Sequence, residues 1–189
     1  FQDRKGKTIV EQDEQPLSAN LEKISRLRPA FEKEGTVTAA NSSSISDGAA
    51  ALVMMSESTA IKRGLTPLAR ILGHSSFAQS PDWFTTAPIG AIKKLLEKVG
   101  WDTYDVDFFE INEAFATVTM AAMKDLELPA EKVNIHGGAC ALGHPVGASG
   151  ARILVTLISA LRKYKKTRGL ASLCIGGGEA TAMAVEVLS

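Results

Sequence analysis

Cysteine is scarce in this sequence: Cys140 and Cys174 are the only two among 189 residues. Two thiols do not make the disulfide framework that staples small secreted domains. A reducing compartment is therefore expected, and the cytoplasm is the favoured location, with an organellar matrix as the alternative.

An excess of charge of one sign is also lacking, since 21 basic residues stand against 21 acidic ones. Nucleic acids and anionic membrane surfaces attract basic patches, so neither partner is expected. Long hydrophobic runs are missing too: no stretch approaches the roughly 20 apolar residues that cross a bilayer. Residues 1–15 are charged and do not resemble a signal peptide. The sequence thus predicts no membrane or nucleic-acid role.

The most distinctive stretch is residues 134–150, which holds five glycines and a proline around His144. Glycine and proline at this density make sharp turns ahead of a helical apolar run. An imidazole held on such a bend can act as a general base; a histidine that merely occupies a loop is the alternative. A metal site of His136, Cys140 and His144 is not expected, because the glycines and Pro145 interrupt the helix that would align them.

Cys174 lies in a second candidate segment. Residues 170–175 read as a buried strand that runs into Gly176 and two further glycines. At the carboxyl end of a strand in an α/β fold, a thiol beside free N–H groups can act as a nucleophile with an oxyanion hole, or as a proton donor and acceptor. The alternative is a small apolar filler, since free cysteine is commonly buried.

Asn112 is the third candidate, where a predicted strand at 106–111 meets a predicted helix at 113–126. Asparagine at such a junction is most often an N-cap. From these residues alone, a chemical role for the carboxamide stays open beside the capping role.

Strand and helix patterns alternate along the chain. Residues 88–99 have apolar side chains at helical spacing, residues 19–27 suggest a short helix, and residues 49–55 suggest a buried strand after a turn. This alternation predicts an α/β fold with helices on both faces of a mixed sheet.

Three segments carry motifs that resemble the thiolase family. Asn-Glu-Ala-Phe at 112–115, Gly-His-Pro-Val-Gly-Ala-Ser-Gly at 143–150 and Cys-Ile-Gly-Gly-Gly at 174–178 occur in the family's order and at similar separations. The resemblance is greatest to the acetyl-CoA acetyltransferase (acetoacetyl-CoA thiolase) branch, and it covers nearly the whole chain. It implies the family's layered αβαβα fold.

The resemblance also implies a domain division, with residues 1–65 as the end of an N-terminal thiolase half carrying a CoA-binding loop segment. Residues 66–189 would be the C-terminal domain. In thiolases the cysteine that becomes acylated lies in the N-terminal half, and neither Cys140 nor Cys174 stands in its motif. Because the sequence starts at Phe1, without methionine, in a segment that resembles the middle of a thiolase, it is expected to be part of a longer polypeptide.

The family's catalytic roles map onto the matching positions. His144 would activate the acylated cysteine and share an oxyanion hole with a water held by Asn112. Cys174 would transfer protons rather than become acylated, and the Gly176 amide would serve a second oxyanion hole. His136 stands where the family usually has asparagine.

Four further positions match the family's substrate contacts. Phe115 would line the acyl pocket, Phe31 would lie near the pantetheine arm, and Ala39 and Ser43 would hold that arm. The implied substrates are coenzyme A thioesters: two acetyl-CoA give acetoacetyl-CoA and CoA, or CoA cleaves a 3-ketoacyl-CoA, with no further cofactor and no metal. A homo-oligomer, dimer or tetramer, is implied as well.

Two other functions are weighed against this one. A related condensing enzyme, such as a ketoacyl synthase, would want a second histidine where this chain has Asn112 or Cys174. The other is a non-catalytic thiolase fragment that binds coenzyme A or a partner chain. The residues present favour a thiolase.

Overall fold

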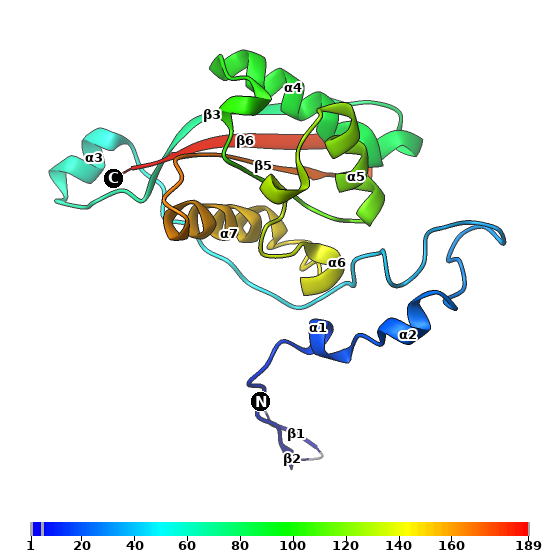
Figure 1. Cartoon of the computed structure of the whole chain (residues 1–189). Helices are drawn as coiled ribbons and strands as arrows, with labels where there is room; N and C mark the ends of the chain where they lie inside the picture. Colours follow the sequence, from blue (N-terminus) through cyan, green and yellow to red (C-terminus); the bar gives the residue numbers. More distant parts are fainter. Residues whose placement is uncertain (1, 5, 189) are drawn as a thin grey trace.

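Residues 2–4 and 6–188 are described by the computed structural model. Phe1 and Ser189, the outer ends of the two expected domains, lie outside the described residues. Figure 1 shows a layered unit of sheet and helices formed by the later part of the chain, while the first part runs along its outside.

A four-stranded sheet, in the order β3-β6-β5-β4, forms the middle layer of this unit. Strands β4 and β5 are parallel, whereas β6 is antiparallel to both β5 and β3. The predicted mixed sheet is therefore confirmed. The strands are β3 (Ala69–Ala78), β4 (Phe108–Ile111), β5 (Arg168–Cys174) and β6 (Glu179–Val187).

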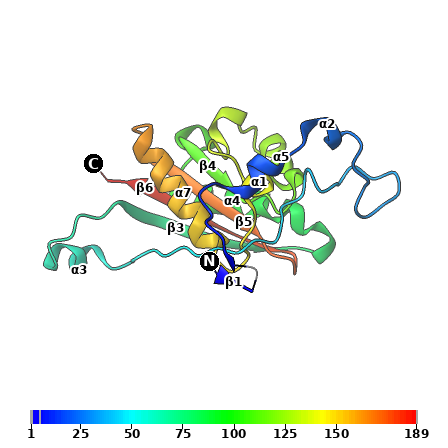
Figure 2. The ribbon, with the colours of Figure 1, turned by 90° about the horizontal axis from the view of Figure 1, so that it is seen from below.

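Helices cover both faces of the sheet, as Figures 1 and 2 show. Because side chains alternate along a strand, Phe109 packs with α4 and α5, whereas Phe108 packs with α7. The α/β class with helices on both faces is thus confirmed, and the described residues supply three layers of the layered fold. The helices are α4 (Ala87–Val99), α5 (Ala116–Asp125) and α7 (Ser149–Lys163).

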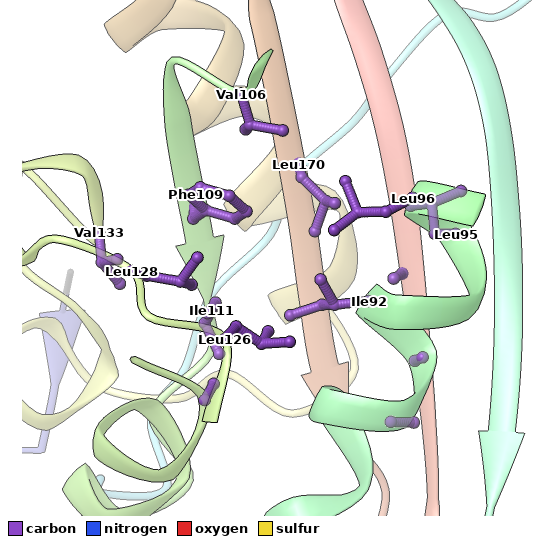
Figure 3. Close-up of a cluster of buried hydrophobic side chains, with 14 of the residues drawn as sticks. Ile92, Leu95, Leu96, Val106, Phe109, Ile111, Leu126, Leu128, Val133 and Leu170 are labelled. Carbon is purple, nitrogen blue, oxygen red and sulfur yellow. The ribbon is translucent and has the colours of Figure 1, made fainter. Parts of the chain in front are cut away.

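The larger hydrophobic core lies between β4, β5 and α4 (Figure 3). Phe109 and Ile111 of β4 meet Leu170 of β5 and Ile92 and Leu95 of α4, and all five side chains are 0% exposed. Burial of each such side chain stabilises the fold by about 1.5–3 kcal/mol. The carboxyl end of β4, from which Asn112 follows, is therefore firmly anchored.

The other elements are short. The helix expected at 19–27 is reduced to four residues, Leu21–Ile24, and none of them is buried. A helix this short is marginal without packing, and nothing in the described part of the chain covers its apolar side. These elements are β1 (Gln2–Asp3), β2 (Gly6–Lys7), α1 (Glu14–Ser18), α2 (Leu21–Ile24), α3 (Glu57–Lys62), α6 (Ala139–Leu142) and the 3₁₀ turns η1 (Pro81–Thr86), η2 (Thr103–Asp105) and η3 (Ala130–Lys132).

The buried strand predicted at 49–55 is wrong. These residues belong to neither of the two sheets that the described residues form, and most of them are exposed, with Val53 at 88% and Met54 at 67%. A strand is stabilised by hydrogen bonds and side-chain pairs with a neighbouring strand, and none lies alongside this segment. Its apolar composition predicted burial, but the surface that would bury it is not among the described residues.

The helix predicted to follow Asn112 directly begins later than expected. Helix α5 starts at Ala116, and Phe115 rather than Asn112 is its N-cap. The amide of Ala116 donates to the Asn41 carbonyl at 2.9 Å, and Phe115 forms an antiparallel bridge with Ser42. The residues between β4 and α5 therefore form a bend held by the 41–43 segment, which frees the Asn112 side chain from capping.

Candidate active site

His144 lies on the bend between α6 and α7. Its backbone amide donates to the Ser44 carbonyl at 2.9 Å, beside an isolated parallel bridge between His144 and Ile45. The preceding Gly143 has a φ of +88°, and a side chain there would collide with the Ser46 hydroxyl, so glycine is required. The backbone of the histidine is thus fixed against the 44–46 segment.

Both ring nitrogens of His144 have partners. Nε2 lies 3.2 Å from Asn112 Nδ2, and Nδ1 lies 2.5 Å from Ser149 Oγ. The Ser149 hydroxyl also donates to the Pro145 carbonyl at 3.0 Å. The structure therefore brings together two of the three predicted catalytic side chains. Because each ring nitrogen has a partner, the orientation of the imidazole is fixed.

Asn112 is fixed by the end of β4. Its amide donates to the Ser172 carbonyl at 2.9 Å, and the residue is 1% exposed. Its side-chain oxygen Oδ1 is buried and has no hydrogen-bond partner among the described residues. Because an unpaired buried polar atom is costly, this oxygen is expected to take a donor from a water or a ligand.

Cys174 lies at the same edge of the sheet as Asn112. Strands β4 and β5 are parallel with Ile111 opposite Ser172, so Asn112, which follows β4, and Cys174, the last residue of β5, lie at the carboxyl ends of adjacent strands. Within the described residues the thiol makes no hydrogen bond to His144 or Asn112. Burial raises the pKa of the Cys174 thiol above its ordinary value, which keeps it protonated at neutral pH.

Gly176 lies in the tight turn that joins β5 to β6. The turn is closed by the Ile175 amide donating to Glu179 O at 2.7 Å and the Gly178 amide donating to Ile175 O at 3.1 Å. The amide of Gly176 has no acceptor among the described residues. It is an exposed, available donor two residues beyond Cys174.

Two of the predicted substrate-binding residues lie against each other. The rings of Phe31 and Phe115 meet edge to face with centroids 5.8 Å apart, and Phe84 approaches Phe115 from another side at 6.3 Å. Phe31 remains 72% exposed. The structure thus brings a residue of the first part of the chain to the bend that carries Asn112.

Ala39 and Ser43 lie between Phe31 and Phe115 in the sequence. Both the amide and the hydroxyl of Ser43 donate to the Ala114 carbonyl, at 3.1 and 3.0 Å. Ala39 is exposed in the turn that leads into the segment. The predicted pantetheine-binding residues therefore lie beside the bend between β4 and α5. The Ser43 hydroxyl already donates its proton to the Ala114 carbonyl, so it could only accept a hydrogen bond from a ligand.

Sequence reasoning missed a brace between Glu113 and Asn134. Asn134 Nδ2 and the Cys140 amide donate to the Glu113 carboxylate, at 2.8 and 3.1 Å. Asn134 also donates to Ile111 O and accepts from Ile111 N, both at 2.8 Å. A side chain at Gly138 would collide with this carboxylate. The brace ties the Asn112 bend to the start of the His144 loop; an acidic residue beside the candidate asparagine was its sequence signal.

A buried ion pair lies under the site. Glu110 is 2% exposed, and its carboxylate lies 3.7 Å from the Arg152 guanidinium, whose Nε has no partner among the described residues. Burial, opposed by Arg152, raises the pKa of Glu110 to about 7. Burial and the nearby Arg152 charge both lower the pKa of His144, so its imidazole is neutral at neutral pH.

Glu110 makes the stability of the protein depend on pH. Between pH 4.5 and about 7 the folded state keeps a proton on Glu110 that the unfolded state has released, so the free energy of unfolding should fall as pH rises through that window. The fall should amount to roughly 3 kcal/mol. Urea denaturation of the protein and of Glu110→Gln at both ends of the window measures it. The amide does not titrate, so equal pH dependence in the two proteins would contradict this assignment.

Neither a metal-ligand cluster nor a membrane-spanning helix is found within residues 2–4 and 6–188. No group of three His, Cys, Asp or Glu side chains within residues 2–4 and 6–188 is placed to hold a metal ion. His136 instead lies against the Tyr164 ring, with centroids 5.7 Å apart. Over the same residues, no helix is both long and apolar enough for a bilayer.

Known proteins resemble the chain over nearly its full length. Two family models match it: the thiolase N-terminal domain over residues 1–58 and the thiolase C-terminal domain over residues 65–187. The acetyl-CoA acetyltransferase of Escherichia coli (strain K12) is 52% identical over 187 residues, which cover 98% of this chain and 48% of that protein. The cytosolic acetyl-CoA acetyltransferase of Mus musculus is 53% identical over 186 residues, which cover 97% and 47%.

Solved structures give the same result. The acetyl-CoA acetyltransferase of Bacillus anthracis aligns with a TM-score of 0.94 at 46% identity, over 100% of this chain and 48% of that one. The Acat5 thiolase of Ascaris suum, solved in complex with coenzyme A, aligns with a TM-score of 0.86 at 40% identity, over 95% and 47%. The chain thus spans about half the length of the proteins it matches. By sequence, by structure and by the motifs on its three bends, this chain belongs to the thiolase family.

Proposed function

We propose that the chain contributes to acyl transfer between coenzyme A thioesters: two acetyl-CoA give acetoacetyl-CoA and CoA, or CoA cleaves a 3-ketoacyl-CoA. The observation that carries the proposal is the contact of His144 Nε2 with the Asn112 carboxamide, at the sheet edge where Cys174 ends β5. Relatives at about half identity carry the name acetyl-CoA acetyltransferase.

His144 would serve the first half of the reaction. Its neutral imidazole takes the proton from a cysteine thiol supplied by an N-terminal half, and the thiolate attacks the carbonyl carbon of the first thioester. The developing oxyanion would be stabilised beside the imidazole and by a water bound to Asn112, whose unpaired Oδ1 leaves room for such a donor. The C–S bond to CoA then breaks, leaving an acyl-cysteine.

Cys174 would transfer one proton at the end of the first half of the reaction and one in the second half. Its raised pKa suits a thiol that first protonates the departing CoA thiolate and then, as a strongly basic thiolate, removes a proton from the methyl group of the second acetyl-CoA. The resulting carbanion attacks the acyl-cysteine, forms the new C–C bond and expels the cysteine thiolate. The free amide of Gly176 would stabilise the enolate oxygen of the second thioester.

The substrate would approach along residues 31–43. Phe31 and Phe115, in edge-to-face contact, would flank the acyl end, and Ala39 and Ser43 would contact the pantetheine arm. No cofactor beyond the thioester substrates is required by this chemistry. We further assign residues 1–65 to the N-terminal half and 66–189 to the C-terminal domain, in a cytoplasmic homo-oligomer, dimer or tetramer.

The test joins this chain to the half of the Escherichia coli relative that the chain does not match and assays acetoacetyl-CoA cleavage. Activity that disappears in the His144→Asn version of the same chimera is expected. The isolated chain should be inactive for lack of the acylated cysteine. A chimera that is folded by circular dichroism yet inactive would favour a fragment that only binds CoA, and an active isolated chain would overturn the requirement for a second half.

Asn112→Ala should slow turnover without unfolding the protein. Loss of one oxyanion donor costs roughly 10²- to 10³-fold in kcat. Its side chain bonds only to His144 among the described residues, so the melting temperature should change little. Steady-state kinetics and thermal denaturation of the active chimera measure both quantities; a near-normal kcat would remove Asn112 from the mechanism.

A further inference from the structure

The unexplained group at the site is Ser149, the first residue of α7. It is 0% exposed, and among the described residues its hydroxyl makes two polar contacts: His144 Nδ1 at 2.5 Å and the Pro145 carbonyl at 3.0 Å. None of the functions described above requires a hydroxyl here. Its place directly behind the imidazole raises the question of which proton it holds.

The hydroxyl has one proton to share between these two partners. A serine in a helix commonly donates to the carbonyl four residues earlier, as Ser149 does to Pro145, whose oxygen also accepts from the amides of Ala148 and Ser149 at 2.7 and 2.8 Å. Its oxygen then accepts from His144, so the imidazole proton lies on Nδ1. Nε2 is left with a lone pair, which faces Asn112 Nδ2 at 3.2 Å.

The reverse arrangement is also chemically complete. If Ser149 donated to Nδ1, the proton of His144 would lie on Nε2, and Asn112 would have to turn its oxygen toward the ring. The Asn112 amide group would then be buried with two N–H donors and no acceptor, whereas the first arrangement leaves its carbonyl oxygen and only one N–H unpaired among the described residues. Orphaned buried N–H groups are rarer than under-satisfied carbonyls.

The geometry points to Ser149 as a positioning residue that fixes the neutral tautomer of His144, with the proton on Nδ1 and Nε2 free as the base. This inference rests on the proposed function, since it assigns the role of base to His144. The Ser149 hydroxyl touches no reacting atom and acts through the imidazole. Free imidazole side chains prefer the opposite tautomer, so a partner at Nδ1 is needed to hold this one.

The tautomer can be measured without any activity assay. Nitrogen NMR of the full chain labelled at histidine reports which ring nitrogen is protonated, and only three histidines are present. The His144→Asn variant identifies the His144 signals. A proton on Nδ1 at neutral pH is expected, and a proton on Nε2 would overturn the inference even if the protein proved to be an active thiolase.

Variants test whether the hydroxyl is responsible. Ser149→Ala should move the His144 proton toward Nε2 and lower kcat of the active chimera by about 10-fold. This loss is smaller than the roughly 10²- to 10⁴-fold that general base catalysis provides, because the imidazole itself remains. KM should change little. Ser149→Thr keeps a hydroxyl and should restore the Nδ1 tautomer and most of the rate.

Ser75→Ala is the matched control, because Ser75 is also a buried serine whose hydroxyl donates to a backbone carbonyl, that of Ala91 at 2.6 Å. It should leave the His144 tautomer unchanged. If Ser149→Ala kept the Nδ1 tautomer, the hydroxyl would have only a structural role and the inference would fail. If no chimera were active, the proposed function would fail while the NMR result still decided the tautomer.

Discussion

His144→Asn is expected to slow acyl transfer by roughly 10²- to 10⁴-fold, the range that general acid–base catalysis provides. Asparagine keeps a polar side chain of similar reach but cannot take a proton near neutral pH. The backbone of the bend is held by the 44–46 segment, so the fold should survive the change. The measurement is kcat/KM for acetoacetyl-CoA cleavage by the chimera.

The pH profile sharpens this expectation. Burial and the Arg152 charge lower the pKa of His144, so its neutral, basic form persists below its ordinary pKa of 6.5. The acidic limb of kcat/KM should therefore fall only below pH 6.5, and it should be absent in the residual activity of His144→Asn. An unchanged profile in the variant would remove the histidine from the acid–base chemistry.

His136→Asn is the matched control for this substitution. His136 lies in the same loop but is exposed and faces Tyr164. Asparagine is also the residue that thiolases usually have there, so the change should leave the rate within about threefold, as for surface substitutions of small energetic effect. A large loss would mean that any change in this loop disturbs the site. The effect of His144→Asn could then not be assigned to the loss of the imidazole.

Cys174→Ser is the second large effect, with an expected loss of roughly 10²- to 10⁴-fold in kcat. The substitution exchanges one sulfur for one oxygen in a site that is 9% exposed, so packing changes little. A serine hydroxyl holds its proton too tightly to exchange it with a thiolate or a carbon acid. The deprotonation of the second acetyl-CoA should therefore become rate-limiting. Slower exchange of the acetyl-CoA methyl hydrogens with solvent would detect this change.

Cys140→Ser distinguishes this role from a general need for thiols. Burial and the Glu113 carboxylate raise the pKa of Cys140 to about 12, and its Sγ lies 3.8 Å from Glu113 O. An inert thiol of this kind should be replaceable with little loss of rate. Comparable losses at Cys140 and Cys174 would contradict the assignment of proton transfer to the latter.

The sequence predicted the parts of the fold that local pattern controls. Helix α4 follows from apolar spacing closed by Gly100, which takes a φ of +69°. Strand β5 follows from a continuous apolar run, because both its faces are covered by helices. The three motif-bearing bends were located correctly, because glycine, proline and strand ends identify bends without knowledge of tertiary contacts.

Tertiary contacts account for the errors. The 49–55 segment has the composition of a strand, but no strand within residues 2–4 and 6–188 pairs with it. Asparagine is a common helix N-cap, yet α5 begins only at Ala116, whose amide donates to the Asn41 carbonyl. The sequence does not single out Ser149 or Glu113, because serine and glutamate are common near helix starts and only the fold places them beside His144 and Asn134.

The pairing of Ile111 with Ser172 has a consequence for how the gene can vary. Asn112 and Cys174 are positioned by adjacent strands. Adding or deleting one residue within either strand would turn the later side chains of that strand to the opposite face of the sheet. A single-residue insertion or deletion within β4 or β5 should therefore separate these two side chains and abolish the proposed activity.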